Sequence, residues 1–302
     1  MGTLTPGETA RRLKSRDGLA WRAGPFVVSL RADVPAFPEQ FHLLYGEHRL
    51  AEEIGKTNDF RLELARPWGL RRWWRPKVFF EMDGPTRMAP FPLDHALPLF
   101  EWGFNYAIAT RANQYLLLHA AVVAQGERAL LLPGLPGSGK STLCAALVLR
   151  GWRLLSDEFG LLRPGSGELA PLPRSIALKN ASIAVIRAFD PAAVLGPEFP
   201  KTRKGTVAHL RPPPESVQDQ ERVARPVWVV SPRFEAGAAA RLVPLPRDHG
   251  FLRLAHNAFN YELQGERGFR AVTRMTRECR FFDLTFGDPG EAVALLDEMA
   301  AS

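Results

Sequence analysis

The segment from Gly134 to Ser141 contains the residues best suited to chemistry. It matches the pattern G-x-x-x-x-G-K-[ST] at every fixed position. Glycines let consecutive backbone N–H groups curl around phosphate oxygens without a Cβ clash, and a following helix points its positive end at them. A lysine in this position binds the β and γ phosphates, and a hydroxyl binds Mg²⁺. The predicted phosphate-binding residues are Gly134, Gly137, Ser138, Gly139, Lys140, Ser141 and Thr142.

An acidic pair, Asp157 and Glu158, begins 17 residues after Lys140 and follows the apolar run 152–155. A carboxylate near bound phosphates can hold Mg²⁺ through oxygen, or it can accept the proton of an attacking hydroxyl. The structural alternative is that the pair only caps a helix or lies in a solvated turn.

The apolar runs around these residues predict the strands and the helix that hold them. The runs 115–123 and 129–132, joined by a turn with Gly126, predict a hairpin at the centre of a sheet. Residues 142–150 predict a helix, and 152–155 predict another strand. Strand, loop, helix and strand make a βαβ unit with parallel strands, whose loops gather at the carboxyl ends. We therefore expect the acidic pair to face the phosphates.

The first third of the chain has a different pattern. Short apolar stretches at 26–30, 60–64 and 78–82 predict strands, and 98–110 predicts a helix. We expect a β-rich or α+β region over 1–110 and an α/β nucleotide-binding domain over 111–302. Near the end of the chain, 281–286 predicts a strand. Asp288 and Pro289 predict the start of a core-packing helix that reaches Ala300.

The chain resembles a known family over three stretches. These are Leu117–Ala121 with His119, the glycine-rich segment 134–142, and Gly151–Glu158. Together they resemble the HPr serine kinase/phosphorylase superfamily, most closely its HPr-kinase-related "kinase A" proteins. The resemblance covers about residues 100–302 and is sharpest over 115–160. It implies a P-loop fold akin to phosphoenolpyruvate carboxykinase, ATP and Mg²⁺ as cofactors, and phosphoryl transfer to a hydroxyl.

The resemblance also implies roles for single residues. Lys140 and Ser141 bind phosphate and metal, Asp157 is the base toward the acceptor hydroxyl, and Glu158 supports Mg²⁺. His119 matches the histidine before the P-loop strand, which gives it a catalytic role; a lone histidine on an apolar strand is otherwise more often a core residue, so both alternatives stay open. The family has two aspartates where this chain has Asp-Glu, and the chain lacks a clear copy of the later signature loop that supports phosphorolysis. These departures argue against a phosphorylase activity and against HPr itself as the acceptor.

A basic segment runs from Lys201 to Arg211, and prolines 212–214 follow it. Gly205 and the proline run predict a loop. As a mobile clamp, the loop would place Lys204 or Arg211 on the γ-phosphate at closure. The alternative is a solvated loop with no special role.

Two other segments are weaker candidates. Arg174 and Lys179 resemble the basic segment in kind. The segment 67–77 interleaves tryptophan with arginine and lysine, and predicts a hairpin whose tryptophans pack on the core. Its alternatives are docking of a protein or peptide, single-stranded nucleic acid, or a membrane surface.

The composition narrows the class of protein. Hydrophobic residues make up 46% of the 302 and charged residues 24%, which excludes a mainly disordered chain. No apolar run reaches about 18 residues and the N-terminus has no apolar core, so we expect a cytoplasmic protein without a membrane span. The net charge of +7 does not by itself predict a nucleic-acid partner. We expect Cys144 and Cys279 to be reduced core thiols.

Three functions fit these observations. The leading hypothesis is an ATP- and Mg²⁺-dependent kinase that phosphorylates a hydroxyl, serine or threonine of a protein or peptide. The second is a kinase for a metabolite hydroxyl, which an enclosed rather than open site near Asp157 would favour. The third is a switch ATPase. It would need a downstream apolar strand that ends in an acid, but the run 227–230 ends in Ser231-Pro232. The sequence identifies no oligomer interface and leaves oligomerisation open.

Overall fold

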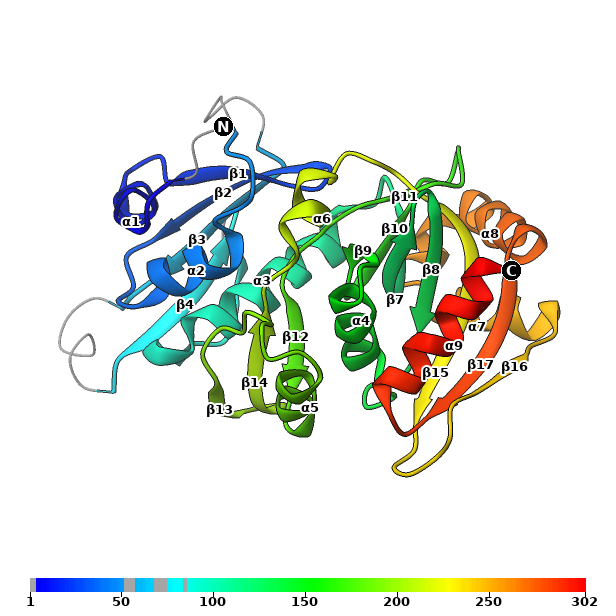
Figure 1. Ribbon diagram of the computed structural model, residues 1–302. Helices are drawn as coiled ribbons and strands as arrows, with labels where there is room; N and C mark the ends of the chain where they lie inside the picture. The colour runs from blue at the N-terminus through cyan, green and yellow to red at the C-terminus, as the bar shows by residue number, and fades with distance from the viewer. Residues whose placement is uncertain (1–3, 52–57, 68–74, 84–85) are drawn as a thin grey trace.

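The computed structural model describes residues 4–51, 58–67, 75–83 and 86–302. Over these residues the fold is mixed α/β, with three sheets and helices packed around them (Figure 1). No helix within the described ranges is long and apolar enough to cross a membrane.

The first sheet belongs to the N-terminal region. Its strands are β1 (Leu19–Ala23), β2 (Phe26–Ala32), β3 (Phe60–Ala65), β4 (Lys77–Met82), β5 (Thr86–Arg87) and β6 (Phe91–Pro92). The associated helices are α1 (Pro6–Lys14), α2 (Phe37–Tyr45), the short 3₁₀ helix η2 (Leu93–His95) and α3 (Ala96–Arg111). The strands predicted at 26–30, 60–64 and 78–82 and the helix predicted at 98–110 are confirmed.

Helices α1 and α2 are not among the elements predicted from the sequence. The start of α1 is nonetheless encoded locally, because Thr5 and Glu8 form a reciprocal capping box and Pro6 occupies the first turn. Most of the tryptophan-rich segment 67–77 lies outside the described residues.

The second sheet has the order β11-β10-β7-β8-β15-β17-β16, and β9 also pairs with β7. Its strands are β7 (Leu116–Gln125), β8 (Arg128–Pro133), β9 (Arg153–Ser156), β10 (Phe159–Leu162), β11 (Leu169–Ala170), β15 (Arg225–Phe234), β16 (Arg241–Pro244) and β17 (Arg280–Phe286). The third sheet has the order β12 (Ile176–Lys179), β14 (Gly205–Leu210) and β13 (Phe199–Thr202). The remaining helices are α4 (Lys140–Leu149), α5 (Ala181–Phe189), α6 (Pro214–Gln218), α7 (Arg247–His256), α8 (Tyr261–Glu278) and α9 (Pro289–Ala301).

The predicted hairpin is confirmed as β7 and β8, and its side chains alternate between two cores. Ala121 and Val123 pack in the cluster that contains α4 and α9, whereas Ala120 and Val122 pack in the cluster that contains α8. A strand with both faces covered by helices must be apolar on both faces, which explains the continuous apolar run. The predicted core helix at the chain end is also confirmed, because the Asp288 side chain caps α9 and its residues Val293, Leu296 and Met299 are buried.

The βαβ prediction is correct in direction but not in adjacency. β8 and β9 both pair antiparallel with β7, so they run parallel to each other. They are not hydrogen-bonded neighbours, because β7 lies between them. The parallel neighbours of this sheet are instead β8, β15 and β17.

The basic segment 201–211 was wrongly expected to be a loop. Most of it forms the β13–β14 hairpin, whose turn uses Gly205 at a φ of +86°. A side chain is strained at such an angle, so glycine suits this turn. Prolines 212–214 do follow the end of β14 at Leu210, as residues without a backbone N–H donor should.

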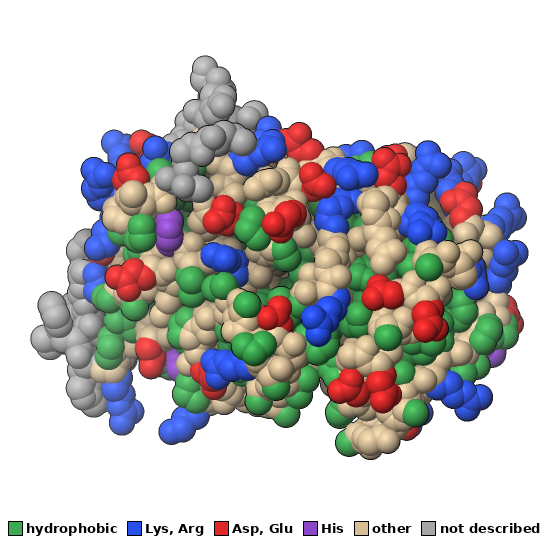
Figure 2. All heavy atoms as spheres, in the orientation of Figure 1, with side chains coloured by type: hydrophobic (Ala, Val, Ile, Leu, Met, Phe, Trp, Pro, Cys, Tyr) green, Lys and Arg blue, Asp and Glu red, His purple; other side chains and the backbone are tan. Residues whose placement is uncertain are grey.

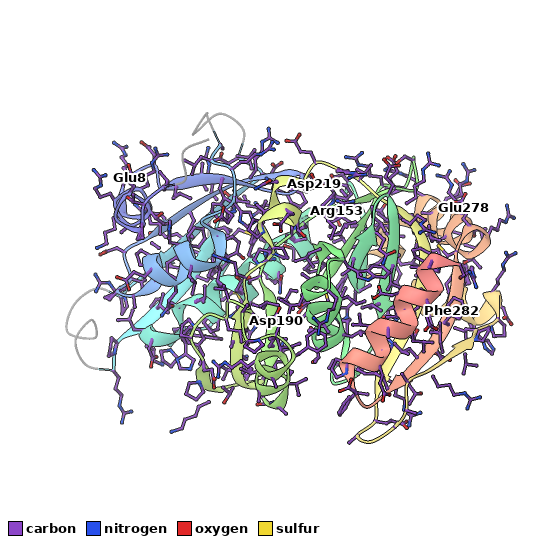
Figure 3. The ribbon with its side chains drawn as sticks, viewed as in Figure 1. Glu8, Arg153, Asp190, Asp219, Glu278 and Phe282 are labelled. Atoms are coloured by element: carbon purple, nitrogen blue, oxygen red, sulfur yellow. The ribbon has the colours of Figure 1, made fainter. Side chains whose placement is uncertain are left out.

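Cys144 and Cys279 are buried and free, as expected for core thiols. On the face seen in Figure 2, basic and acidic side chains are interspersed. Three hydrogen bonds from Arg153 tie β9 to its surroundings: they go to Asp219 O at 3.5 Å, Arg222 O at 2.7 Å and Gly126 O at 3.2 Å. Figure 3 shows Arg153 beside Asp219 at the end of α6. These contacts fix the strand that leads into the acidic pair.

Candidate functional site

The glycine-rich loop, residues 134–139, connects β8 to α4. Gly137 and Gly139 have φ angles of +87° and +85°, in the left-handed region that favours glycine. A Cβ on Gly139 would also lie 2.9 Å from Phe286 Cζ. The N–H of Phe234 donates to Ser138 O at 3.1 Å and holds the loop against the end of β15. Backbone conformation and close packing therefore explain why this loop needs glycine.

The helix that follows begins with unpaired donors. No acceptor in the described part of the chain binds the backbone N–H groups of Ser141 and Thr142, and Gly139 gives α4 no side-chain cap. Ser138 Oγ is also buried without a partner among the described residues. Such groups at a helix N-terminus favour an anion.

Lys140 is the first residue of α4 and is only 9% exposed. Burial lowers its pKa, and the charges of Glu158 and Asp157 partly oppose this effect. The structure thus brings the lysine and the acidic pair within electrostatic range, as the sequence analysis expected.

Asp157 and Glu158 occupy a two-residue break between β9 and β10, which both pair with β7. The register is the same on both sides of the break, with Ser156 opposite Val122 and Phe159 opposite His119. The Phe159 N–H donates to Ser156 Oγ at 3.1 Å across the break. The pair therefore lies between two strand segments rather than at the free end of a strand.

The pKa values of the two carboxyls are shifted in opposite directions. Asp157 is 5% exposed, and burial together with the charge of Glu158 raises its pKa. Burial also disfavours the charged form of Glu158, but a hydrogen bond from His119 and the charge of Lys140 outweigh it and lower the pKa. Neighbouring groups whose pKa values are pushed apart are typical of acid–base sites.

The hydrogen bonds of Asp157 are incomplete. Its Oδ2 accepts from the Ala177 N–H at 3.3 Å, and its Oδ1 is buried with no partner among the described residues. One oxygen of a buried carboxyl is thus left for a further donor.

His119 lies on β7, and its Nε2 is 3.5 Å from Glu158 Oε2. Its ring packs against Phe259, with a centroid distance of 5.1 Å. The side chain is partly exposed, so His119 is not an enclosed core histidine, and it contacts the acidic pair directly.

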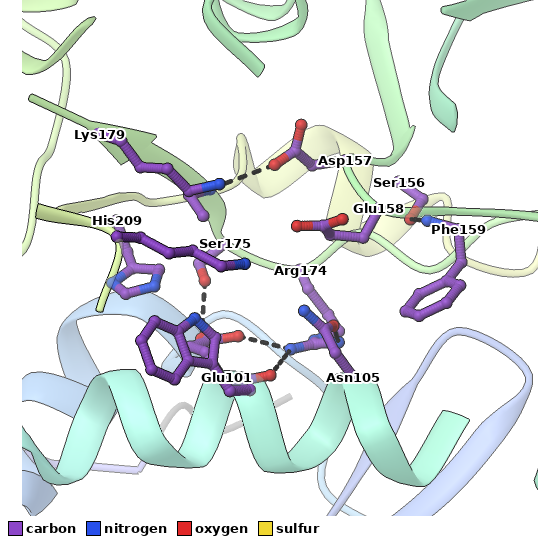
Figure 4. Close-up of a pocket in the computed structure, with 13 residues that line it drawn as sticks. Glu101, Asn105, Ser156, Asp157, Glu158, Phe159, Arg174, Ser175, Lys179 and His209 are labelled. Atoms are coloured by element: carbon purple, nitrogen blue, oxygen red, sulfur yellow. Dashed lines mark hydrogen bonds and ion pairs between the residues drawn. The ribbon is translucent and has the colours of Figure 1, made fainter. Parts of the chain in front are cut away.

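A pocket beside the acidic pair is formed by three parts of the molecule. Trp102 and Asn105 come from α3, Asp157 and Glu158 from the β9–β10 break, and Lys179 from β12. Lys204, in the β13–β14 turn, and His209, on β14, also line it. Figure 4 shows α3 along one side and Asp157 across from it. We refer to this space as the acidic-pair pocket.

One wall of this pocket is a dense polar cluster around Glu101. Glu101 is 4% exposed and accepts from Tyr45 Oη and Ser175 Oγ, each at 2.7 Å, and from Arg174 Nη2 at 2.5 Å. Arg174 Nη1 also donates to Asn105 Oδ1 at 2.7 Å (Figure 4). The cluster joins α3 of the N-terminal region to the segment that precedes β12.

Of the basic residues singled out in the sequence, some line the acidic-pair pocket and others do not. Lys179 and Lys204 line the acidic-pair pocket. Arg174 is committed to the Glu101 cluster. Arg211 does not line the pocket, and its backbone N–H donates to Val194 O at 2.9 Å. Proximity to the acidic pair thus favours Lys204 over Arg211.

Sequence reasoning missed the α3 residues of this site, Glu101, Trp102 and Asn105, and gave no role to His209. Glu101 did carry a signal, because it lies at −3 and −7 from the buried Phe104 and Ile108, on an apolar helix face. An acid on such a face needs a buried partner. His209 carried no comparable signal.

Comparison with known protein families finds no family model that matches the chain, and comparison with curated proteins finds no significant match.

Proposed function

We propose that this protein is an ATP- and Mg²⁺-dependent kinase, with a P-loop domain of the HPr serine kinase type, that transfers the γ-phosphoryl group to a hydroxyl. The observation that carries the proposal is the meeting of a G-x-x-x-x-G-K-S loop with two carboxyls whose pKa values shift in opposite directions. A purely structural acidic pair would not need an unpaired, buried carboxylate oxygen.

The loop fits a triphosphate. The unpaired N–H groups at the start of α4 and the Ser138 hydroxyl supply donors, and the Lys140 ammonium supplies a positive charge. Ser141 and Glu158 supply the hard oxygen ligands that Mg²⁺ accepts beside phosphate oxygens. No group of three His, Cys, Asp or Glu side chains suited to a metal occurs among the described residues. Bound Mg²⁺ would offset the phosphate charge.

In the proposed reaction, Asp157 Oδ1 accepts the proton of the acceptor hydroxyl. The hydroxyl oxygen forms a bond to the γ-phosphorus, the bond between that phosphorus and the β,γ-bridging oxygen breaks, and ADP leaves with the electron pair. The raised pKa of Asp157 makes it a stronger base than an ordinary carboxylate. Lys140 stabilises the charge on the transferred group.

The leading acceptor is a serine or threonine of a protein or peptide. A second candidate, a small metabolite, is favoured by the enclosure of Asp157, which is only 5% exposed and lies between α3 and the third sheet. A narrow hydroxyl-bearing group suits this space in either case.

The test follows the fate of the γ-phosphate. The protein, Asp157→Ala and the exposed control Asp17→Asn are each incubated with labelled ATP, Mg²⁺ and cell extract. Label in a polypeptide with the wild type and the control, but not with Asp157→Ala, supports the leading acceptor. Label in a small molecule supports the second. Release of free phosphate alone contradicts the kinase proposal and favours a switch ATPase.

A further inference from the structure

The acidic-pair pocket contains two buried polar groups without partners. Besides Asp157 Oδ1, both ring nitrogens of His209 lack a hydrogen-bond partner among the described residues, and His209 is only 1% exposed. His209 lies directly opposite Ala177 in the β12–β14 pair, and the Ala177 N–H binds Asp157. Native proteins rarely bury unpaired polar groups, so two at neighbouring positions mark where a polar atom of a water or of a ligand can bind.

The same pocket has two cations without a close counter-ion. No carboxylate of the described residues lies within ion-pair distance of Lys179 or Lys204; Glu158, which pairs with His119, acts on both lysines from a greater distance. The Lys204 Nζ lies 5.5 Å from the centre of the Trp102 ring. Burial lowers the pKa of Lys204, the like charge of Lys179 lowers it further, and the charge of Glu158 opposes this. An anion between them would relieve this repulsion.

The α3 wall cannot supply that anion. Both carboxylate oxygens of Glu101 are used by Arg174, Tyr45 and Ser175. In the proposed reaction, Asp157 accepts the proton of the acceptor hydroxyl and does not pair with the lysines. Glu158 pairs with His119 and is assigned to Mg²⁺ in the proposed function, so direct contact with the two lysines is left to an anionic group on the ligand.

We propose that the acidic-pair pocket binds an acceptor alcohol that carries a carboxylate or phosphate group close to its reacting hydroxyl. The hydroxyl donates to Asp157 Oδ1, the anionic group accepts from Lys179 and Lys204, and His209 binds a further polar atom. Trp102 of the N-terminal region forms the apolar side of the site. This inference rests on the proposed kinase function and names its acceptor class.

The experiment compares acceptors in matched pairs that differ in the anion. The pairs are glycerol 3-phosphate with glycerol, L-serine with L-serinamide, and acetyl-Ser-Asp-amide with acetyl-Ser-Asn-amide. Transfer from labelled ATP is measured for each, and slow hydrolysis of ATP by water is followed in the same samples. We expect at least one anionic member to exceed its neutral mate by about tenfold or more in kcat/KM. The pair that responds distinguishes a free phosphate, a free carboxylate and an acidic peptide.

Variants show whether the preference comes from this pocket. Lys204→Met and Lys179→Met should reduce the preference about tenfold, mainly by raising the KM for the acceptor, with the Kd for ATP changed less than about twofold. Lys201→Met, on the exposed side of the same hairpin, is the matched control and should keep the preference. Trp102→Leu should raise the acceptor KM and so report the contribution of α3.

Three results would overturn the inference while leaving the kinase proposal intact. They are equal use of every matched pair, a preference that survives in the Lys179→Met/Lys204→Met double variant, and transfer to neutral members without transfer to any anionic member. Absence of both ATP turnover and ATP binding would instead overturn the proposed function.

Discussion

Two buried carboxyls, Glu101 and Asp157, line the same pocket, and their surroundings differ. Glu101 accepts hydrogen bonds from three side chains, and although burial opposes its charge, Arg174 and other partners lower its pKa. Asp157 accepts one long bond from a backbone N–H, and burial raises its pKa although the Ser141 hydroxyl and Lys140 oppose this. A fully bonded ion pair holds two parts of a fold together. A buried carboxyl with few hydrogen bonds makes the fold less stable, and its raised pKa makes it a stronger base. This combination is typical of functional sites.

The largest expected effect tests the Asp157 side of this comparison. Asp157→Asn removes the proton acceptor but keeps the size of the side chain, so phosphoryl transfer should fall about 10²- to 10⁴-fold. Steady-state transfer of label, with Asp17→Asn as the control, measures this loss. A decrease of less than about threefold would show that another group accepts the proton.

The second prediction concerns the Glu101 side. Glu101→Gln leaves the buried Arg174 without its counter-ion, and the free energy of unfolding should fall by about 3–5 kcal/mol. Denaturant unfolding measures the change. Glu266→Gln, which breaks an exposed pair with Arg270 on α8, should lower it by no more than about 0.5 kcal/mol. Equal losses in the two variants would show that the buried pair stabilises the fold no more than the exposed pair does.

The stability of the region around Glu101 should also depend on pH. His48 borders the Glu101 cluster, and its Nε2 contacts Pro173 O at 3.1 Å. Burial, with a smaller contribution from the charge of Arg174, lowers its pKa from 6.5 to about 4 against the hydrogen bonds to Pro173 and Tyr45 and the charge of Glu101. Between pH 6.5 and pH 4, His48 is protonated in the unfolded chain but neutral in the folded one. Stability should therefore fall by up to about 3 kcal/mol as the pH drops toward 4.

The control for this effect is His48→Gln, in which the loss of stability between pH 6.5 and pH 4 should become shallower. Unfolding curves for both proteins across this pH range make the comparison. A slope that is the same in both would assign the acid sensitivity to other groups, such as His209, whose pKa burial also lowers.

The smallest expected effect concerns Arg211. Its side chain does not line the acidic-pair pocket, so Arg211→Ala should change kcat/KM by no more than about twofold. A loss as large as that of Lys204→Met would restore Arg211 as a phosphate ligand. The pair of variants separates two residues that sequence alone treats as equivalents.

The sequence predicts the half of the site that is local in the chain. The β7–β8 hairpin, the glycine-rich loop and α4 follow one another, and apolar period and glycine chemistry identify them. The opposite wall comes from residues far apart in sequence, such as Glu101 and Arg174, which hydrogen bond across 73 positions. Periodicity identifies an acid on an apolar helix face, but it does not identify the partner, because tertiary packing selects that partner.

The basic segment shows a second limit. Proline and glycine suggested a loop, whereas the structure forms a hairpin because β14 finds partners in β12 and β13. Pairing with distant strands outweighs local propensity.

The most direct test of the contrast between the two carboxyls is the free energy of unfolding of Asp157→Asn at neutral pH, measured beside wild type and Glu101→Gln. Because Asp157 is buried with one oxygen unpaired, the variant should be as stable as the wild type or more stable, while Glu101→Gln loses several kcal/mol. A loss in Asp157→Asn as large as that in Glu101→Gln would show that both carboxyls serve the fold, and would contradict the account.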